Sequence, residues 1–349
     1  MSLTKSAEKQ EALFSGILFL INMKALYLII LSTILCSCQN KESETTEYIQ
    51  ASVKTTDLLL NKTGTYLIVL GNVQDAGSPQ IACTKKCCQD LFENPDKNRK
   101  VVSLGLVDIE NHSNFLFEAT PDMVEQVKIL KNQGKNASEI PDAIFITHAH
   151  IGHYSGLMYL GKEAMNADKT LVYTMPRMKK FLKNNGPWSQ LVLNENISLQ
   201  ALNNEQDLDL SPGIKVTPYT VPHRDEFSET VGYTIAGPAK KALFIPDIDK
   251  WEKWDRDIIN EIKKVDYAFI DATFYDGEEV NNRDISQIPH PFVIESMDKF
   301  SKLSAKEKNK IIFIHFNHTN PLLNTDSPQT KQVLKNGYRI ARMNDIYPL

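Results

Sequence analysis

The sequence lacks any run of lysine and arginine, and this absence bears on the class of partner. Its 39 basic side chains are balanced by 43 acidic ones. Proteins whose main role is nucleic-acid binding cluster basic side chains on one face to contact phosphates. No nucleic-acid partner is therefore expected, and a small-molecule substrate is favoured.

Internal repeats are also lacking, and so is any long low-complexity linker after residue 56. Residues 57–349 are therefore expected to form one large domain. Cysteine is scarce as well, since only Cys83, Cys87 and Cys88 remain outside the N-terminal region. An odd set with two adjacent members is a poor disulfide framework.

The N-terminal region has no uninterrupted apolar run long enough to span a bilayer. The apolar run 25–35 is short, follows Met23 and the basic Lys24, and is followed by Cys36-Ser37-Cys38. A basic start, a short apolar stretch and small residues before a cleavage point are typical of a secretory signal. An uncleaved membrane anchor is the alternative.

The ending Leu-x-Ser-Cys resembles the bacterial lipoprotein box, which implies that Cys38 is acylated and becomes the first mature residue. We therefore expect residues 1–38 to be a leader and the polar residues 39–56 to be a flexible tether. The protein would then be exported and held at a membrane by its N-terminal lipid.

Short apolar runs rich in β-branched and aromatic residues predict a layered α/β fold. The expected strands are 65–70, 115–117, 143–146, 171–174, 215–220, 242–245, 267–270 and 311–314. The expected helices are 121–131, 156–165, 178–183 and 291–303, with Pro291 as a first helical residue. Most histidines fall in loops that follow these strands, where α/β sheets gather ligands and catalytic groups.

The densest group of histidines is His148-x-His150-x-x-His153, directly after the expected strand 143–146. Neutral imidazole is a preferred nitrogen ligand of zinc. Three imidazoles on one loop can converge on a single ion, so this loop predicts a metal site.

This group resembles the His-x-His-x-Asp-His signature of the metallo-β-lactamase superfamily. Later segments resemble the family's remaining motifs in order: Val221-Pro222-His223, Phe244-Ile245-Pro246-Asp247 and Phe313-Ile314-His315-Phe316-Asn317-His318. The segments 74–83 and 315–321 look like the two ends of the pyrroloquinoline quinone biosynthesis protein B group. Other segments resemble the branch that includes the tRNA 3′-end-processing endonuclease.

The resemblance implies a four-layer αββα sandwich with metal ions at one sheet edge. One ion would be held by His148, His150, His223 and Asp247, and a second by His153, His315 and the bridging Asp247. The implied activity is hydrolysis of an ester or phosphodiester-type bond in a small exported substrate by metal-bound hydroxide. Zinc is the expected metal, with iron or manganese as alternatives.

Gly152 departs from the signature because it stands where the family has aspartate. The second ion would lose an oxygen ligand and a negative charge. Half occupancy, a single-metal enzyme, or a replacement carboxylate such as Asp225 or Asp249 are all open. We expect the second ion to bind more weakly than the first, and Gly152→Asp to raise its occupancy.

His290 and His318 are the candidate proton carriers, because a leaving group needs a proton and imidazole has a suitable pKa. His290 matches a histidine near the active site of the endonuclease branch, although it could simply cap a helix. His318 could instead replace His315 as the last ligand of the second ion.

Cys83, Cys87 and Cys88 resemble, with altered spacing, a cysteine cluster that holds a structural zinc in related proteins. A fourth ligand would come from elsewhere. Free thiols or a Cys83–Cys87 disulfide are the alternatives.

Two other functions remain open. The quinone-biosynthesis resemblance implies oxidative chemistry in cofactor maturation, with iron in place of zinc. Gly152 suggests a binding lipoprotein on a scaffold that has lost its activity.

Overall fold

The computed structural model describes residues 64–281 and 283–349. The expected leader, the tether and the lipid attachment point Cys38 lie outside the described residues, so these remain predictions. Within the described ranges, no helix has the length and apolar character that crossing a membrane requires.

Two seven-stranded mixed sheets form the centre of the domain. The first has the order β14 (Ile346–Pro348), β1 (Thr65–Gly71), β2 (Ser103–Asp108), β3 (Ser113–Phe117), β4 (Ala143–Phe145), β5 (Thr170–Thr174) and β6 (Ile197–Ala201). The second has the order β13 (Arg339–Ile340), β12 (Ile311–Ile314), β11 (Tyr267–Asp271), β10 (Lys241–Ile245), β9 (Val231–Ala236), β8 (Ile214–Thr220) and β7 (Leu208–Ser211). Neighbouring strands pair in parallel from β3 to β6 in the first sheet. They do so from β10 to β13 in the second.

Alternating side chains of the strands face opposite layers, as the two-residue period of a strand requires. Leu67 and Val69 of β1 lie in the core between the sheets, together with Phe117, Phe145 and Phe244. Ile68 and Leu70 face the other way, against helices. Both faces of the central strands are therefore buried, which explains their nearly continuous apolar sequences.

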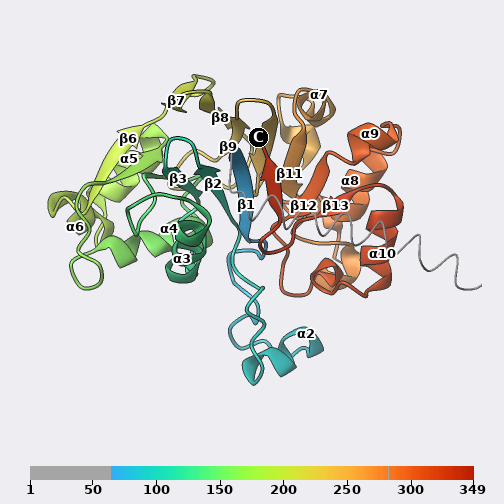
Figure 1. Ribbon diagram of the computed structural model, residues 1–349. Helices are drawn as coiled ribbons and strands as arrows, with labels where there is room; N and C mark the ends of the chain where they lie inside the picture. Colours follow the sequence, from blue (N-terminus) through green and yellow to red (C-terminus); the bar gives the residue numbers. More distant parts are fainter. Residues whose placement is uncertain (1–63, 282) are drawn as a thin grey trace, which may run out of the picture. The chain divides into compact units, whose positions relative to one another are not determined.

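Helices cover the outer face of each sheet (Figure 1). Those on the first sheet are α3 (Met123–Gln133), α4 (Ile151–Tyr154), α5 (Pro176–Asn184) and α6 (Trp188–Leu193). The second half of the chain contributes α7 (Ile258–Lys263), α8 (Val293–Lys299), α9 (Ala305–Lys308) and α10 (Pro328–Lys335). This arrangement confirms the expected αββα sandwich.

Two helix expectations need correction. The stretch 156–165 forms only a 3-10 helix, η2 (Ser155–Leu160), followed by turns. Pro291 is not helical, because α8 begins at Val293 and Glu295 accepts a hydrogen bond from the backbone N–H of Phe292 at 2.8 Å. That bond satisfies a free donor at the helix start.

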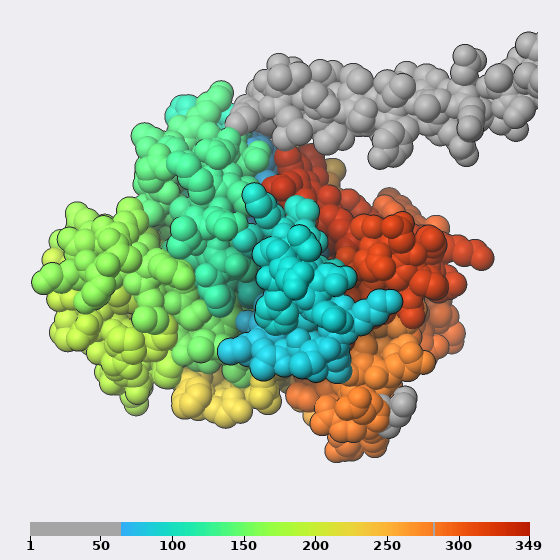
Figure 2. Space-filling view, turned by 90° about the horizontal axis from the view of Figure 1, so that it is seen from below, coloured from blue at the N-terminus to red at the C-terminus, as the bar shows by residue number. Residues whose placement is uncertain are grey.

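Residues 72–100, here called the cap segment, follow β1 and contain the short helix α2 (Lys86–Gln89). Figure 2 shows this segment, in blue to cyan, lying between the green segments of the first half and the orange and red segments of the second. The backbone N–H groups of Asn72 and Val73 donate to the Lys100 carbonyl at 3.0 Å, which closes the segment at its base. Gln74 N–H donates to the Phe316 carbonyl at 2.8 Å.

Candidate metal centre

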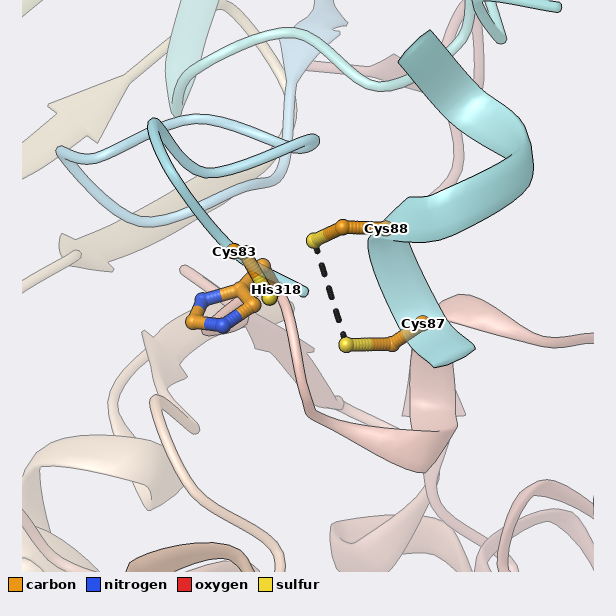
Figure 3. Close-up of side chains that lie close together, drawn as sticks. All are labelled: Cys83, Cys87, Cys88 and His318. Atoms are coloured by element: carbon orange, nitrogen blue, oxygen red, sulfur yellow. Dashed lines mark hydrogen bonds between the residues drawn. The ribbon is translucent and has the colours of Figure 1, made fainter. Parts of the chain in front are cut away.

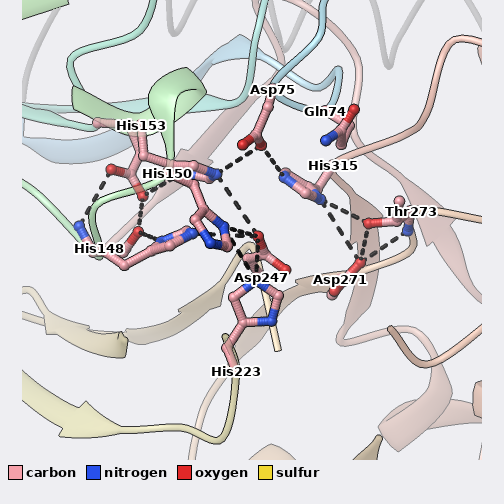
Figure 4. Close-up of polar contacts among 12 residues, drawn as sticks. Gln74, Asp75, His148, His150, His153, His223, Asp247, Asp271, Thr273 and His315 are labelled. Atoms are coloured by element: carbon pink, nitrogen blue, oxygen red, sulfur yellow. Dashed lines mark hydrogen bonds and ion pairs between the residues drawn. The ribbon is translucent and has the colours of Figure 1, made fainter. Parts of the chain in front are cut away.

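The histidines and aspartates expected as ligands come together from the ends of strands in both sheets (Figure 4). His148, His150 and His153 follow β4, His223 follows β8, Asp247 follows β10, and His315 follows β12. The loops after these strands meet at one edge of the sandwich, the usual position of a site in such folds. Asp75, from the cap segment after β1, lies among them. We call these six residues and Asp75 the main centre.

The first group in the main centre consists of His148, His150, His223 and Asp247, with one donor atom from each within 4.8 Å of the others. The Asp247 Oδ2 atom lies 3.4 Å from His148 Nε2 and 3.1 Å from His223 Nε2. His148 and His223 face Asp247 with Nε2, whereas His150 faces the group with Nδ1, which lies 3.3 Å from His223 Nε2. Three imidazoles and one carboxylate in this arrangement suit a divalent cation.

The second group consists of His153, His315, Asp247 and Asp75, again within 4.8 Å. Asp75 Oδ1 lies 2.9 Å from His153 Nε2 and 3.2 Å from His315 Nε2. The Asp247 Oδ2 atom that borders the first group is also 3.9 Å from His153 Nε2. Asp247 is thus placed between the two groups, as expected for a bridging ligand.

One buried atom tests whether these residues fit a cation. His148 Nε2 is buried and has no hydrogen-bond partner among the described residues. An unpaired buried nitrogen is costly, and a cation at the first group would satisfy it. The donor set therefore fits the metal that the motifs imply.

Carboxylates and hydroxyls behind the ligands fix their orientation. Glu118 is buried after β3, accepts from Thr147 Oγ1 at 2.6 Å and lies 3.2 Å from His153 Nδ1. On the opposite side, Thr273 Oγ1 lies 2.8 Å from His315 Nδ1 and donates to Asp271 at 2.7 Å. Such partners orient metal-binding imidazoles and raise their basicity.

Two of these residues adopt left-handed backbone conformations, Glu118 with φ 77° and His315 with φ 69°. Non-glycine residues rarely adopt this region, and such strain is concentrated at functional sites.

The electrostatics are those of a tightly packed acid and imidazole network. Burial works against charge on Asp247, but His223 and His290 hold its pKa well below the usual range. Burial and the neighbouring His153 lower the pKa of His148, which favours the neutral, metal-binding form. Burial opposes a charge on His315, yet its bonds to Asp271 and Asp75 raise its pKa to about 9.

His290 also reaches the main centre. Its Nδ1 atom lies 2.9 Å from Asp271 Oδ2 and 3.2 Å from Asp247 Oδ1. Burial would lower its pKa, but Asp271 and Asp247 raise it to about 10. The structure thus brings His290 to the main centre, and His290 is not the cap of α8, because that position is held by Phe292.

Neither proposed replacement for the motif aspartate is at the second group. Asp225 pairs with Arg177 at the surface, and Asp249 pairs with Lys253. Asp75 lies there instead, a residue that the sequence did not identify as a ligand. The available signal was an acidic residue in the loop after the first strand, in a chain whose metal loop lacks its own.

His318 lies in a different place from the one expected. It joins Cys83, Cys87 and Cys88 in a group whose donor atoms lie within 4.8 Å of one another, which we call the cysteine cluster (Figure 3). The structure thus groups His318 with the three cysteines and not with the donor atoms of the main centre. His318 is the fourth donor that the cysteines needed, and Cys3His is a donor set suited to zinc. The three cysteines are free thiols, with no disulfide.

Known proteins share this architecture. Coenzyme PQQ synthesis protein B of Gluconobacter oxydans (strain 621H) is 25% identical over 299 residues, which cover 79% of this chain and 95% of that protein. The structure of Zn2+-bound PqqB from Methylobacterium extorquens matches with a TM-score of 0.66 and 20% identity, over 81% of this chain and all of that one, 100%. A diphosphatase from the PhnP family matches with a TM-score of 0.58 and 21% identity, over 82% and 97% of the two chains.

The two structural matches show the fold alone, and the family follows from the sequence itself. Residues 113–316 of the 349 match the family described as the beta-lactamase superfamily domain. This range spans more than half of the chain and runs from β3 to just beyond His315. The chain therefore belongs to the beta-lactamase superfamily and has the metallo-β-lactamase fold.

Proposed function

We propose that this protein is a metal-dependent hydrolase acting on an ester or phosphodiester-type bond. One observation carries the proposal: two groups of imidazole and carboxylate donors lie side by side and share Asp247. Two divalent cations held there would act as Lewis acids on the scissile group and make a nucleophile available at neutral pH.

The chain's own residues have distinct tasks in this reaction. His148, His150 and His223 would hold one cation, His153 and His315 would hold the other, and Asp247 lies between the two groups. His290 donates a proton to the leaving group, since it lies at the edge of the centre against two carboxylates. Asp271 keeps this imidazole oriented and, through Thr273, also orients His315.

A small substrate with a phosphodiester-type bond is favoured within this class. The similar solved structures include a protein described as a diphosphatase, and a pair of cations suits both oxygens of an in-line displacement at phosphorus. We further propose that the substrate is met outside the cytoplasm, with the enzyme held at a membrane by lipid on Cys38.

Metal analysis combined with a substrate panel tests the proposal. The purified protein is assayed with a chromogenic phosphodiester, a lactone and a β-lactam before and after chelation. We expect phosphodiester hydrolysis that disappears on chelation and returns with zinc or manganese. Asp247→Asn should abolish it with loss of metal from the main centre, whereas Asp209→Asn, at an exposed position on β7, should change neither.

Oxidative cofactor maturation is the second candidate, and the similarity to a coenzyme PQQ synthesis protein over nearly its full length favours it. A site rich in histidine with few carboxylates accepts iron as well as zinc. Purified protein that contains iron and hydrolyses none of the panel would favour this candidate. Protein that binds no metal at the main centre would favour a binding role.

A further inference from the structure

Gly152 and Asp75 occupy the same space in the main centre. A Cβ atom built on Gly152 would lie 2.4 Å from Asp75 Cα, 2.7 Å from its Cβ and 2.9 Å from its Cγ. Real side chains do not approach this closely, so no residue larger than glycine fits at position 152 while Asp75 stays in place. The Asp75 side chain, from the cap segment, thus occupies the space that the aspartate of the family signature would take at position 152.

Asp75 also makes the contacts expected of an anionic ligand at this point. Its Oδ1 atom is within hydrogen-bonding distance of both His153 Nε2 and His315 Nε2, at 2.9 and 3.2 Å. The other nitrogen of each imidazole faces a residue behind the centre: His315 Nδ1 lies 2.8 Å from Thr273 Oγ1, and His153 Nδ1 lies at the ion-pair distance of 3.2 Å from Glu118 Oε1. The nitrogens that face Asp75 are therefore the ones available to a cation.

From this geometry we propose that Asp75 is the carboxylate ligand of the second cation, delivered by the cap segment, and that Gly152 is its necessary counterpart. The inference rests on the proposed function only in requiring a second cation. The weaker second site expected from Gly152 alone is then corrected, because that site keeps a full set of two imidazoles and two carboxylates.

A cation bound at the second group would join the cap segment to the two other parts of the chain that supply its ligands. Asp75 belongs to this segment, whereas His153 lies in α4, which follows β4, and His315 lies in the loop after β12. The cysteine cluster lies between the same two parts of the chain, because Cys83, Cys87 and Cys88 are in the cap segment and His318 follows His315. Binding at the second group should therefore protect the cap segment from proteolysis.

Metal titration of variants of the full chain tests the proposal without an activity assay. Asp75→Asn keeps the volume and removes the charge, so it should weaken zinc binding at the second group on the order of tenfold or more and leave the first ion bound. Asp90→Asn, in the same segment but exposed and outside both groups, is the control and should leave zinc binding unchanged.

Reciprocal substitutions sharpen the test. Gly152→Asp should lower the bound zinc because it displaces Asp75, contrary to the gain expected from the sequence. Asp75→Gly/Gly152→Asp should bind the second ion more tightly than Asp75→Gly alone, since glycine at position 75 removes two of the three clashing atoms and leaves only the Cα to shift. This non-additivity marks two positions in contact.

If the Asp75→Asn variant binds two ions at the main centre as tightly as the natural protein does, the proposal is wrong, even if hydrolysis is observed. Loss of the second ion in a protein that hydrolyses nothing would leave it standing and reject the hydrolase assignment instead. If Gly152→Asp does not fold, the Asp75→Asn titration still decides.

Discussion

His290 stands between two buried carboxylates, Asp247 and Asp271, and this position determines its chemistry. A proton on the imidazole is stabilised by both acids, and the ring borders the centre where a leaving group would depart. The main centre has its other histidines directed at the expected cations, so His290 is the residue that can transfer a proton there.

Replacing His290 with glutamine should therefore slow hydrolysis without emptying the centre. We expect the turnover number to fall on the order of a hundredfold or more, the usual contribution of a positioned acid, while the metal content stays unchanged. His112→Gln, in an exposed turn, is the control. A variant that loses activity and metal together would show that His290 is a ligand and not a proton donor.

Single residues also show where sequence reasoning succeeds and fails. The residues His148, His150, His223 and Asp247 could be identified because each follows a strand in a fixed motif order, and the structure brings them together. Asp75 could not, because its relation to Gly152 is a contact between distant segments. The choice between His315 and His318 was open because both follow the same strand within four residues, and the structure places them in different donor groups.

At the scale of elements, the strands were the most predictable feature. The run 311–314 coincides with β12, and the other expected runs differ from their strands by one or two residues. The strands β2, β6, β7, β9, β13 and β14 were not among the runs expected from the apolar pattern. Four of them, β6, β7, β13 and β14, are edge strands, which carry weak patterns, whereas β2 and β9 lie inside their sheets. Helix α4 is only one turn long and so has no readable period.

The cysteine cluster joins α2 and its preceding turn to the segment after β12, and a zinc ion there would tie these elements together. We expect Cys83→Ser/Cys87→Ser/Cys88→Ser, and separately His318→Ala, to remove about one metal ion per chain and lower the melting temperature by several degrees. Elemental analysis and thermal unfolding measure both effects, with His112→Ala as the control.

Two results would contradict this assignment. If the triple variant loses stability but no metal, the cysteines act without a bound ion. If His318→Ala retains the ion at natural affinity, the fourth ligand is another group.

At the scale of the whole molecule, one half-buried acid outside both centres should govern part of the pH dependence of stability. Burial raises the pKa of Glu279 from 4.5 to about 7, although Thr319 Oγ1 donates a hydrogen bond to it at 2.7 Å. Between these two values the folded protein binds a proton that the unfolded chain does not. This contribution is therefore present at low pH and is lost as the pH rises through about 7.

Glu279→Gln, which imitates the protonated side chain, should remove that dependence. Relative to the variant, the natural protein should lose free energy of unfolding between pH 5 and about 8, by up to roughly 3 kcal/mol at about 1.4 kcal/mol per pKa unit. Urea unfolding of chelator-treated protein across this range measures the difference. Glu278→Gln, its exposed neighbour, should follow the natural protein, and parallel curves for all three would refute the prediction.

Asp75 and His315 are 240 residues apart in the chain, yet both border the second group of the main centre. During synthesis the ligands emerge one after another, and this group is incomplete until His315 has left the ribosome. An ion can therefore be captured there only where the folding of both sheets is completed. Affinities of such ligands follow a fixed order among divalent metals, so availability strongly influences which one is bound. The compartment in which the chain finishes folding thus sets the metal pool from which this centre is loaded.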